Sequence, residues 1–287
     1  MSQTSDPTRS IPTRRISFDE SVAGLPKHFA YDGDLIMSHV VATLSSVFPD
    51  GEDYFVRAVE RAQDRVTDPA LRQDVEGFLG QEEMHGREHR VLNERLSELG
   101  YPTRAIGAYV RWLFRNRERI HNERLHLAFT AALEHYTATL AETLLTNPEA
   151  RAEIGHDGVR SLLVWHALEE SEHKAVAFDV YRHVGGSERM RITTMWMTHA
   201  LFVLETGLWT MISLAMDPEA RRHPGRVLRS LTRLRRSPFA SPRAVRQLLE
   251  YTHSGFHPND RDTSELIAQW RATLFGSDGK LTELLAS

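Results

Sequence analysis

The chain has 287 residues, 41% of them hydrophobic, with a formal net charge of -4 and no cysteine. This length is enough for a substantial core in one large or two small domains, and the near-neutral charge does not indicate a nucleic-acid partner. The lack of cysteine excludes disulfides, thiolate zinc sites, iron–sulfur clusters and a cysteine nucleophile, and it fits a cytoplasmic protein.

The N-terminal segment MSQTSDPTRSIPTRR is polar and has no apolar stretch of the signal-peptide type, so we expect residues 1–15 to form a disordered arm. Strand signals are nearly absent from the remainder, and apolar residues recur about every 3.6 positions, which predicts an all-α fold. FPDG (48–51) and TDPA (67–70) indicate a break and a turn. The predicted helices are, in chain order, 32–46, 52–66, 70–98, 104–117, 120–145, 158–184 and 190–216.

Residues 16–185 are expected to form the helical bundle, and residues 186–287 a helical extension packed on it. The segment 190–216 is long enough to span a bilayer, which takes about 20 residues, but it contains Arg191, His199 and Glu205. We therefore interpret it as a core helix that covers the bundle or forms a homodimer face, and membrane association is the less favoured alternative. The strongly basic stretch 221–243 follows it.

The stretch HALEESEHKAV (166–176) places His166, Glu170 and His173 at intervals of four and three residues. On a helix, Glu170 lies about 40° from His166, and His173 lies about 20° on its other side, so the three side chains share one face. Apolar flanks indicate that this face is buried, where imidazoles and a carboxylate need partners such as a metal ion. Glu169 and Glu172 point away and are expected to be solvated.

A second motif, QEEMHGREH (81–89), contains Glu82-x-x-His85 and a further histidine, His89, one turn later. These three side chains fall within about 60° of one another on a helix. Two Glu-x-x-His motifs are typical of the ferritin-like di-metal bundle, in which each of the two remaining helices supplies one more Glu. The spacing therefore predicts two further carboxylate ligands.

The missing carboxylates can be located because residues at the same depth of an antiparallel hairpin lie equally far from its turn. Glu82 is 14 residues beyond a turn near residue 68, which points to Glu52 or Asp53. Glu60 fits less well, since it would lie roughly 10 Å away along the axis. Glu170 is 18 residues beyond a connection centred near 152, and its mirror position is occupied by Glu134.

The predicted metal ligands are Glu52, Glu82, His85, Glu134, His166, Glu170 and His173. His89 and His135 are candidates for a second layer that hydrogen-bonds the ligands, although a solvent-facing position is the favoured interpretation for each. His257, in the loop GFHPND (255–260), could reach the cavity, but a structural role in the loop is the favoured interpretation.

The ligand set resembles that of ferritin-like di-iron proteins, and the extra histidine in H-x-x-x-E-x-x-H resembles the arylamine N-oxygenases. SSVFPDGEDYF, GFLGQEEMHGREHRVLN, LEHYTA, HALEESEHKAVAFDVY and GFHPND together resemble a bacterial family labelled "predicted metal-dependent hydrolase". The resemblance covers roughly residues 15 to 275. It implies metal ligation, whereas its motifs are unspecific about the reaction.

Carboxylates combined with imidazoles suit iron or manganese, and zinc could also occupy such a site. We expect two iron ions and an O2-dependent oxygenase or oxidase acting on a small organic substrate with an electron donor, because the ligands lie in the middle of long helices. A two-metal hydrolase is the alternative. The third possibility is a ferritin-like metal-binding protein without catalysis.

Overall fold

Helices make up nearly all of the regular structure in residues 11–285, the part of the chain that this computed structural model describes. The long helices are α1 (Leu35–Gln63), α2 (Pro69–Glu98), α4 (Glu123–Thr146), α6 (Asp157–His173) and α8 (Glu188–Met216). The shorter α-helices are α3 (Thr103–Arg117), α5 (Pro148–Glu153), α7 (Val176–His183), α9 (Pro218–Arg222), α10 (Pro224–Leu234), α11 (Pro242–Glu250) and α12 (Ser264–Phe275). Single 3-10 turns are η2 (Tyr31–Gly33), η3 (Pro238–Ala240), η4 (Pro258–Asp260) and η5 (Thr282–Leu284). The predicted all-α fold is confirmed.

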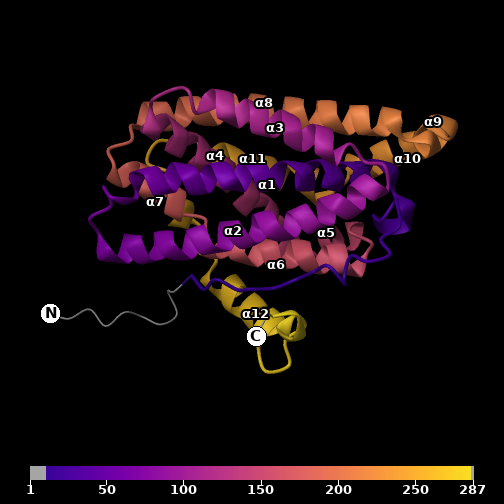
Figure 1. Cartoon of the computed structure of the whole chain (residues 1–287), viewed down its shortest axis with the longest axis horizontal. Helices are drawn as coiled ribbons and strands as arrows, with labels where there is room; N and C mark the ends of the chain where they lie inside the picture. Colours follow the sequence, from indigo (N-terminus) through magenta and orange to yellow (C-terminus); the bar gives the residue numbers. More distant parts are fainter. Residues whose placement is uncertain (1–10, 286–287) are drawn as a thin grey trace.

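Four helices, α1, α2, α4 and α6, form the bundle, in which α1 packs against α2 and α4 packs against α6. Figure 1 shows α8 and α3 along one side of this bundle and α12 on the opposite side. The predicted helix 158–184 is divided, because α6 ends at His173 and α7 begins at Val176.

Side-chain caps define where four of the five long helices, α1, α2, α4 and α8, begin. Asp34, Asp68, Asn122 and Ser187 each accept a hydrogen bond from a backbone N–H in the first turn of the helix that follows. Such caps satisfy N–H groups that have no partner within the helix. Pro69 occupies the first position of α2, where its missing N–H costs nothing.

The break predicted at residues 48–51 is wrong, because α1 continues through Pro49. Proline lacks an N–H, so the carbonyl of Ser45 one turn earlier loses its usual donor. The side chain of Asn93 on α2 replaces it, with its Nδ2 donating to that carbonyl at 2.8 Å. The Ser45 hydroxyl donates in turn to Oδ1 of Asn93 at 2.8 Å. A contact between helices therefore keeps Glu52 on one continuous α1.

Two hydrophobic clusters fill the bundle. Helices α1, α2 and α4 each pass from one to the other, and the chain passes between them again from α6 to α7. In α1, for example, Val41 belongs to the first cluster and Phe55 to the second. In α4, Ala141 belongs to the first and Leu127 to the second. The buried Glu and His side chains of the predicted ligand set lie where each helix crosses between the clusters. Apolar packing on both sides therefore holds these polar groups away from water.

The helix α8 packs on α1 and α4, yet most of it is exposed. Only 11% of its most apolar 18-residue window is buried, so the prediction of a core helix is wrong, whereas the alternative of a homodimer face stays a prediction. Within the described residues, α8 is the one helix long and apolar enough, by length and composition alone, to cross a membrane.

Candidate metal centre

Four carboxylates from four different helices converge in the middle of the bundle. They are Glu52 of α1, Glu82 of α2, Glu134 of α4 and Glu170 of α6, and none is more than 3% exposed. The mirror positions therefore identified buried residues at the depth of the two motifs. Asp53, the alternative to Glu52, lies outside the centre, with its side chain 45% exposed and paired with Arg90.

His173 joins three of these carboxylates. Its Nε2 lies 3.1 Å from an oxygen of Glu82, 3.4 Å from one of Glu134 and 3.6 Å from one of Glu170. The imidazole of His173 thus connects α6 with α2 and α4.

His85 and His166 form the other side of the centre. Nδ1 of His85 lies 3.5 Å from Oε1 of Glu170 and 3.8 Å from Oε1 of Glu82. Nε2 of His166 lies 2.8 Å from Oε1 of Glu170 and 3.6 Å from Oε1 of Glu52. The rings of His85 and His173 are 5.8 Å apart between centroids, close enough to bind a pair of neighbouring ions. The structure therefore brings all seven predicted ligands together.

The donor atoms fit two divalent cations. Two groups, Glu52 with His85 and His166, and Glu82 with Glu170 and His173, each hold one possible ligand atom per residue within 4.8 Å of one another. Both oxygens of Glu52, Glu82 and Glu134 are buried without a hydrogen-bond partner among the described residues. Buried polar atoms of this kind are costly unless something pairs with them. Four carboxylates also match the charge of two divalent ions.

The pKa values of the carboxyl groups reflect this crowding. Burial, followed by the charges of neighbouring carboxylates, raises the pKa of Glu52 and of Glu82 well above the usual range. Burial and the charge of Glu170 raise the pKa of Glu134 to about 7. Positive charge at the centre would reverse these effects, because a cation favours the ionised carboxylate.

The pKa values of the imidazoles shift in opposite directions within this environment. Burial, together with the neighbouring imidazole of His166, lowers the pKa of His85 well below its usual value, which leaves the ring neutral and able to bind a cation. Burial also opposes the charge on His173, but the adjacent carboxylates outweigh it and raise the pKa of His173.

Each of the three histidines is oriented through its other ring nitrogen. Nε2 of His85 lies 3.0 Å from Oε2 of Glu169, and Nδ1 of His173 lies 2.8 Å from Oε1 of Gln81. Nδ1 of His166 lies 2.8 Å from Nε2 of His89. Such outer partners set the tautomer and direction of a metal-binding histidine.

The expectation that Glu169 and Glu172 are solvated is wrong, since both side chains are 0% exposed. Arg14 pairs with both at 2.8 and 2.7 Å, and Glu172 also accepts a hydrogen bond from Gln81 at 2.7 Å. Residues 164–171 of α6 are buried on every side of the helix, so its second carboxylate pair supports the predicted ligands from behind. Its apolar flanks in the sequence were a signal of this complete burial.

The N-terminal segment that carries Arg14 lies against α2. A Cβ at Gly77 would lie 2.5 Å from the carbonyl oxygen of Ile11, so glycine permits this close approach. Of the predicted arm, residues 1–10 lie outside the described residues, whereas residues 11–15 pack on the bundle.

The three second-layer candidates occupy different places. His89 lies at the centre, where Ser45 Oγ contacts its Nδ1 at 2.9 Å and its Nε2 faces His166. His135 instead contacts the backbone carbonyl of Gln247 at 2.9 Å, and His257 pairs with Asp179 at 2.8 Å. Neither of these two contacts a predicted ligand.

The comparison with known families agrees with this arrangement. A family described as predicted metal-dependent hydrolase matches residues 12–262. The chain belongs to this family. Comparison with curated proteins and with solved structures finds no match. The family match spans the bundle, α8 and the loop that contains His257, so it includes every predicted ligand.

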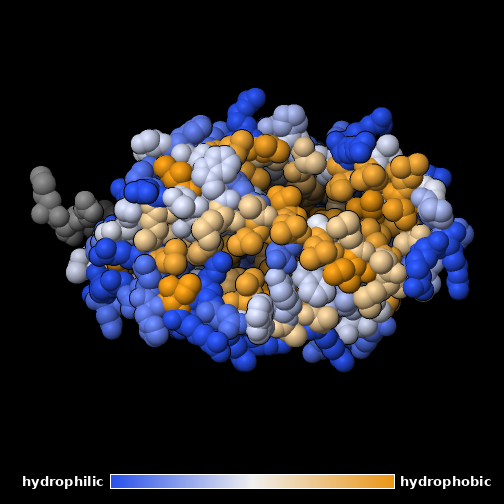
Figure 2. Space-filling view, turned by 90° about the horizontal axis from the view of Figure 1, so that it is seen from above, coloured by the Kyte–Doolittle hydropathy of each residue, from blue (hydrophilic) through white to orange (hydrophobic). Residues whose placement is uncertain are grey.

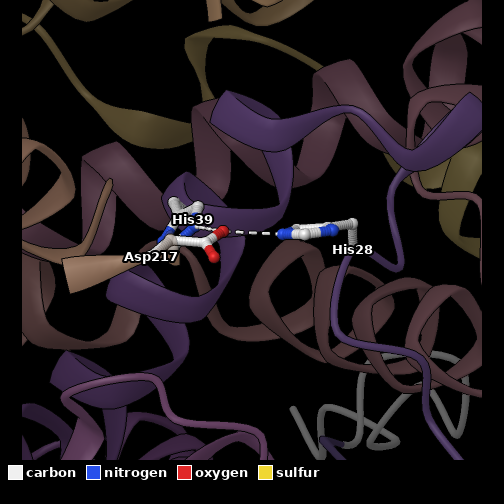
Figure 3. Close-up of side chains that lie close together, drawn as sticks. All are labelled: His28, His39 and Asp217. Carbon is white, nitrogen blue, oxygen red and sulfur yellow. Dashed lines mark hydrogen bonds and ion pairs between the residues drawn. The ribbon is translucent and has the colours of Figure 1, made fainter. Parts of the chain in front are cut away.

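A second histidine–carboxylate cluster in this family member lies at the end of α8 and, unlike the metal centre, is satisfied by its own contacts. Figure 3 shows His28 and His39 directed at Asp217, with their Nε2 atoms 2.7 and 3.2 Å from its Oδ2. Lys27 lies 3.2 Å from Oδ1, and Nδ1 of His39 lies 2.6 Å from the hydroxyl of Ser213. These groups satisfy one another, and the lysine would repel a cation, so the cluster ties the end of α8 to α1.

Two apolar cavities adjoin the metal centre. One, of about 140 Å³, lies among α1, α3, α4 and α8 and reaches Glu52. The other, of about 240 Å³, reaches His166 and Glu170. Their shared lining includes Leu44, Phe48, Leu140 and Phe202. Apolar organic molecules could therefore lie directly beside the carboxylates.

Proposed function

We propose that this family member binds two iron ions at the centre and uses O2 to oxidise an apolar organic substrate in the cytoplasm. The observation that carries this proposal is the contact between the carboxylate-rich centre and the apolar cavities. Carboxylate and imidazole ligands suit iron and manganese. When bound, a pair of iron ions would supply the redox chemistry with O2, and a separate electron donor would return the protein to its reduced state.

The side chains of the protein contribute binding and orientation. Phe48 stands at the boundary between substrate space and ligands, because it lines both cavities and its ring centroid lies 4.8 Å from that of His166. The apolar lining excludes water from the carboxylates, which strengthens the electrostatic interactions inside the centre. Glu169, Gln81 and His89 hold the histidines in place.

Two-metal hydrolysis is the second candidate, and the family description favours it. A zinc or manganese pair can activate water and stabilise the charge that develops in hydrolysis. The apolar cavities favour the oxidative reaction instead, because a hydrolytic site needs access for water and for a polar scissile group. A protein that binds metal without catalysis is the third outcome of the test below.

The test compares metals on the purified full-length protein. We expect two iron ions per chain, a transient visible absorption band when the anaerobically reduced protein meets O2, and continued O2 consumption with excess reductant. Glu134→Ala should lose metal and O2 consumption, whereas Glu83→Ala, on the exposed side of α2, should retain both.

The zinc-loaded protein distinguishes the alternatives when it is assayed anaerobically with p-nitrophenyl butyrate as a general ester probe. Hydrolysis that is lost in Glu134→Ala would overturn the oxidative proposal in favour of the hydrolase. O2 consumption that stops after one oxidation of the bound iron would indicate metal binding without turnover.

A further inference from the structure

The helix α8 is inverted relative to an ordinary surface helix, because its outward side is the apolar one. Its exposed large side chains are Trp196, Met197, Leu201, Val203, Leu204, Leu208, Met211, Ile212 and Met216, and we call this set the α8 face. From residue 193 to residue 216, no exposed residue of α8 is charged. Monomeric soluble proteins rarely expose so continuous an apolar surface, which marks an interaction site.

The inward side of α8 is comparatively polar. Its buried residues include Arg191, Thr194, Thr198, Thr210 and Ser213. Tyr109 of α3 also donates a hydrogen bond to Glu205 at 2.7 Å. Arg191 and Glu205 of α8 are thus paired with other segments of the protein, which holds the helix on the surface of the bundle.

A dense group of arginines follows the α8 face directly. Residues 220–236 contain seven arginines and no acidic residue. Within residues 11–285, five of these arginines are exposed and form no ion pair, namely Arg221, Arg222, Arg229, Arg235 and Arg236. These unpaired arginines next to the apolar α8 face complement a lipid bilayer, which is apolar inside and can carry anionic headgroups at its surface.

The helix α10 has the same dual character on a smaller scale. Leu228 and Leu231 are exposed, at 66% and 37%, and they alternate with Arg229 and Arg233 along the helix. Basic amphipathic helices with exposed leucines are typical of segments that lie in the plane of a membrane interface. Figure 1 places α9 and α10 at the end of α8.

From these observations we infer that the α8 face and the α9–α10 arginines dock this protein on an anionic lipid bilayer. Figure 2 views the molecule from the α8 side and shows a broad hydrophobic area with hollows in it, bordered by hydrophilic residues. The apolar side chains enter the boundary between headgroups and acyl chains, and the arginines contact lipid phosphates. The docking itself is independent of the reaction at the metal centre.

The docked orientation also places the cavities next to the lipid. Leu201 of the α8 face lines the smaller cavity, and Leu234 of α10 lines the larger one. If the proposed oxidation holds, its substrate class is lipophilic and enters from the bilayer rather than from water. Failure of that reaction would leave vesicle binding unchanged, so the two proposals can be separated.

The test is flotation of the full-length protein with vesicles of phosphatidylcholine, with and without phosphatidylglycerol. We expect binding to the anionic vesicles. Leu204→Glu combined with Met211→Glu should abolish it, since both side chains are more than 60% exposed and contribute little to folding. Gln73→Glu, on the exposed surface of α2, is the matched control that adds a charge elsewhere.

The arginines are tested by charge reversal in the same assay. Arg222→Glu combined with Arg229→Glu should lower partitioning into anionic vesicles by about tenfold or more, whereas Arg87→Glu on α2 should not. Tryptophan quenching by brominated lipid should fall when Trp196 is replaced by Phe. Absence of vesicle binding, or equal binding to neutral and anionic vesicles, would overturn the inference. So would a stable dimer in solution that Leu204→Glu dissociates without any vesicle binding, since the face would then join two copies of this chain.

Discussion

Glu134→Gln is expected to stabilise the metal-free protein while weakening its binding of metal. Glu134 is buried among three other carboxylates, and its nearest cationic partner is His173, with Nε2 at 3.4 Å from Oε2. Glutamine has nearly the same shape but cannot ionise. The substitution therefore removes one of the four like charges that only a bound cation would compensate.

The magnitude follows from the pKa of Glu134, which burial and the charge of Glu170 raise from 4.5 to about 7. Between pH 4.5 and 7, the carboxyl group of Glu134 is therefore protonated in the folded state and ionised in the unfolded state. The free energy of unfolding falls as pH rises through this range. The difference of about 2.5 pH units corresponds to about 3 kcal/mol above pH 7, at about 1.4 kcal/mol per unit. Glutamine does not ionise, so the Glu134→Gln protein keeps this part of its free energy of unfolding. We expect the substitution to stabilise the metal-free protein by about 1–3 kcal/mol.

The assay is thermal and denaturant unfolding in the presence of a chelator at a series of pH values. At pH 8, Glu134→Gln should melt about 2–5 °C above the unsubstituted chain, and the two melting temperatures should converge near pH 4.5. Added Fe(II) should reverse the order, because only the unsubstituted chain keeps all four carboxylates. Glu94→Gln, an exposed change on α2, should shift stability by no more than about 0.5 kcal/mol.

A lower melting temperature for metal-free Glu134→Gln at pH 8 would refute this reasoning. It would mean that the four carboxylates are compensated within the protein, so that their arrangement would no longer favour a metal.

Three further predictions concern the groups that support the centre. Glu169→Ala should weaken metal affinity by about 10- to 100-fold in chelator competition, since a histidine ligand loses its acceptor, whereas Glu83→Ala should have no effect; equal affinities would show that this contact is not needed. Arg14→Met should lower the free energy of unfolding by about 3–5 kcal/mol, because the buried Glu169 loses its cation and Glu172 keeps only Arg271; a change below about 1 kcal/mol would mean that water reaches these carboxylates. Asn93→Leu should cost about 1–3 kcal/mol in urea unfolding, since the carbonyl of Ser45 loses its donor, and an unchanged midpoint would contradict the role assigned to this side chain.

The sequence alone was sufficient for the fold class and for selecting the buried Glu and His residues that meet at the centre. Helical periodicity follows from local spacing, and two residues three or four positions apart on one helix must share a face wherever that helix packs. For the same reason, the equal distances of Glu134 and Glu170 from their connection located a buried carboxylate of the centre without any structure.

The tertiary structure decided what depends on contacts between distant segments. Local sequence rules predict that Pro49 ends a helix. Helix α1 continues because Asn93 on α2 donates the hydrogen bond that the Ser45 carbonyl would otherwise lack. The direction of Glu169 away from the ligand face was correct, but its burial depends on Arg14, 155 residues away. Helix α8 shows the same limit, since hydropathy reports how apolar a helix is but not which side meets the bundle. The polar side of α8 meets the bundle, because hydrogen-bond partners such as Tyr109 lie on that side. This packing leaves the apolar side of α8 exposed.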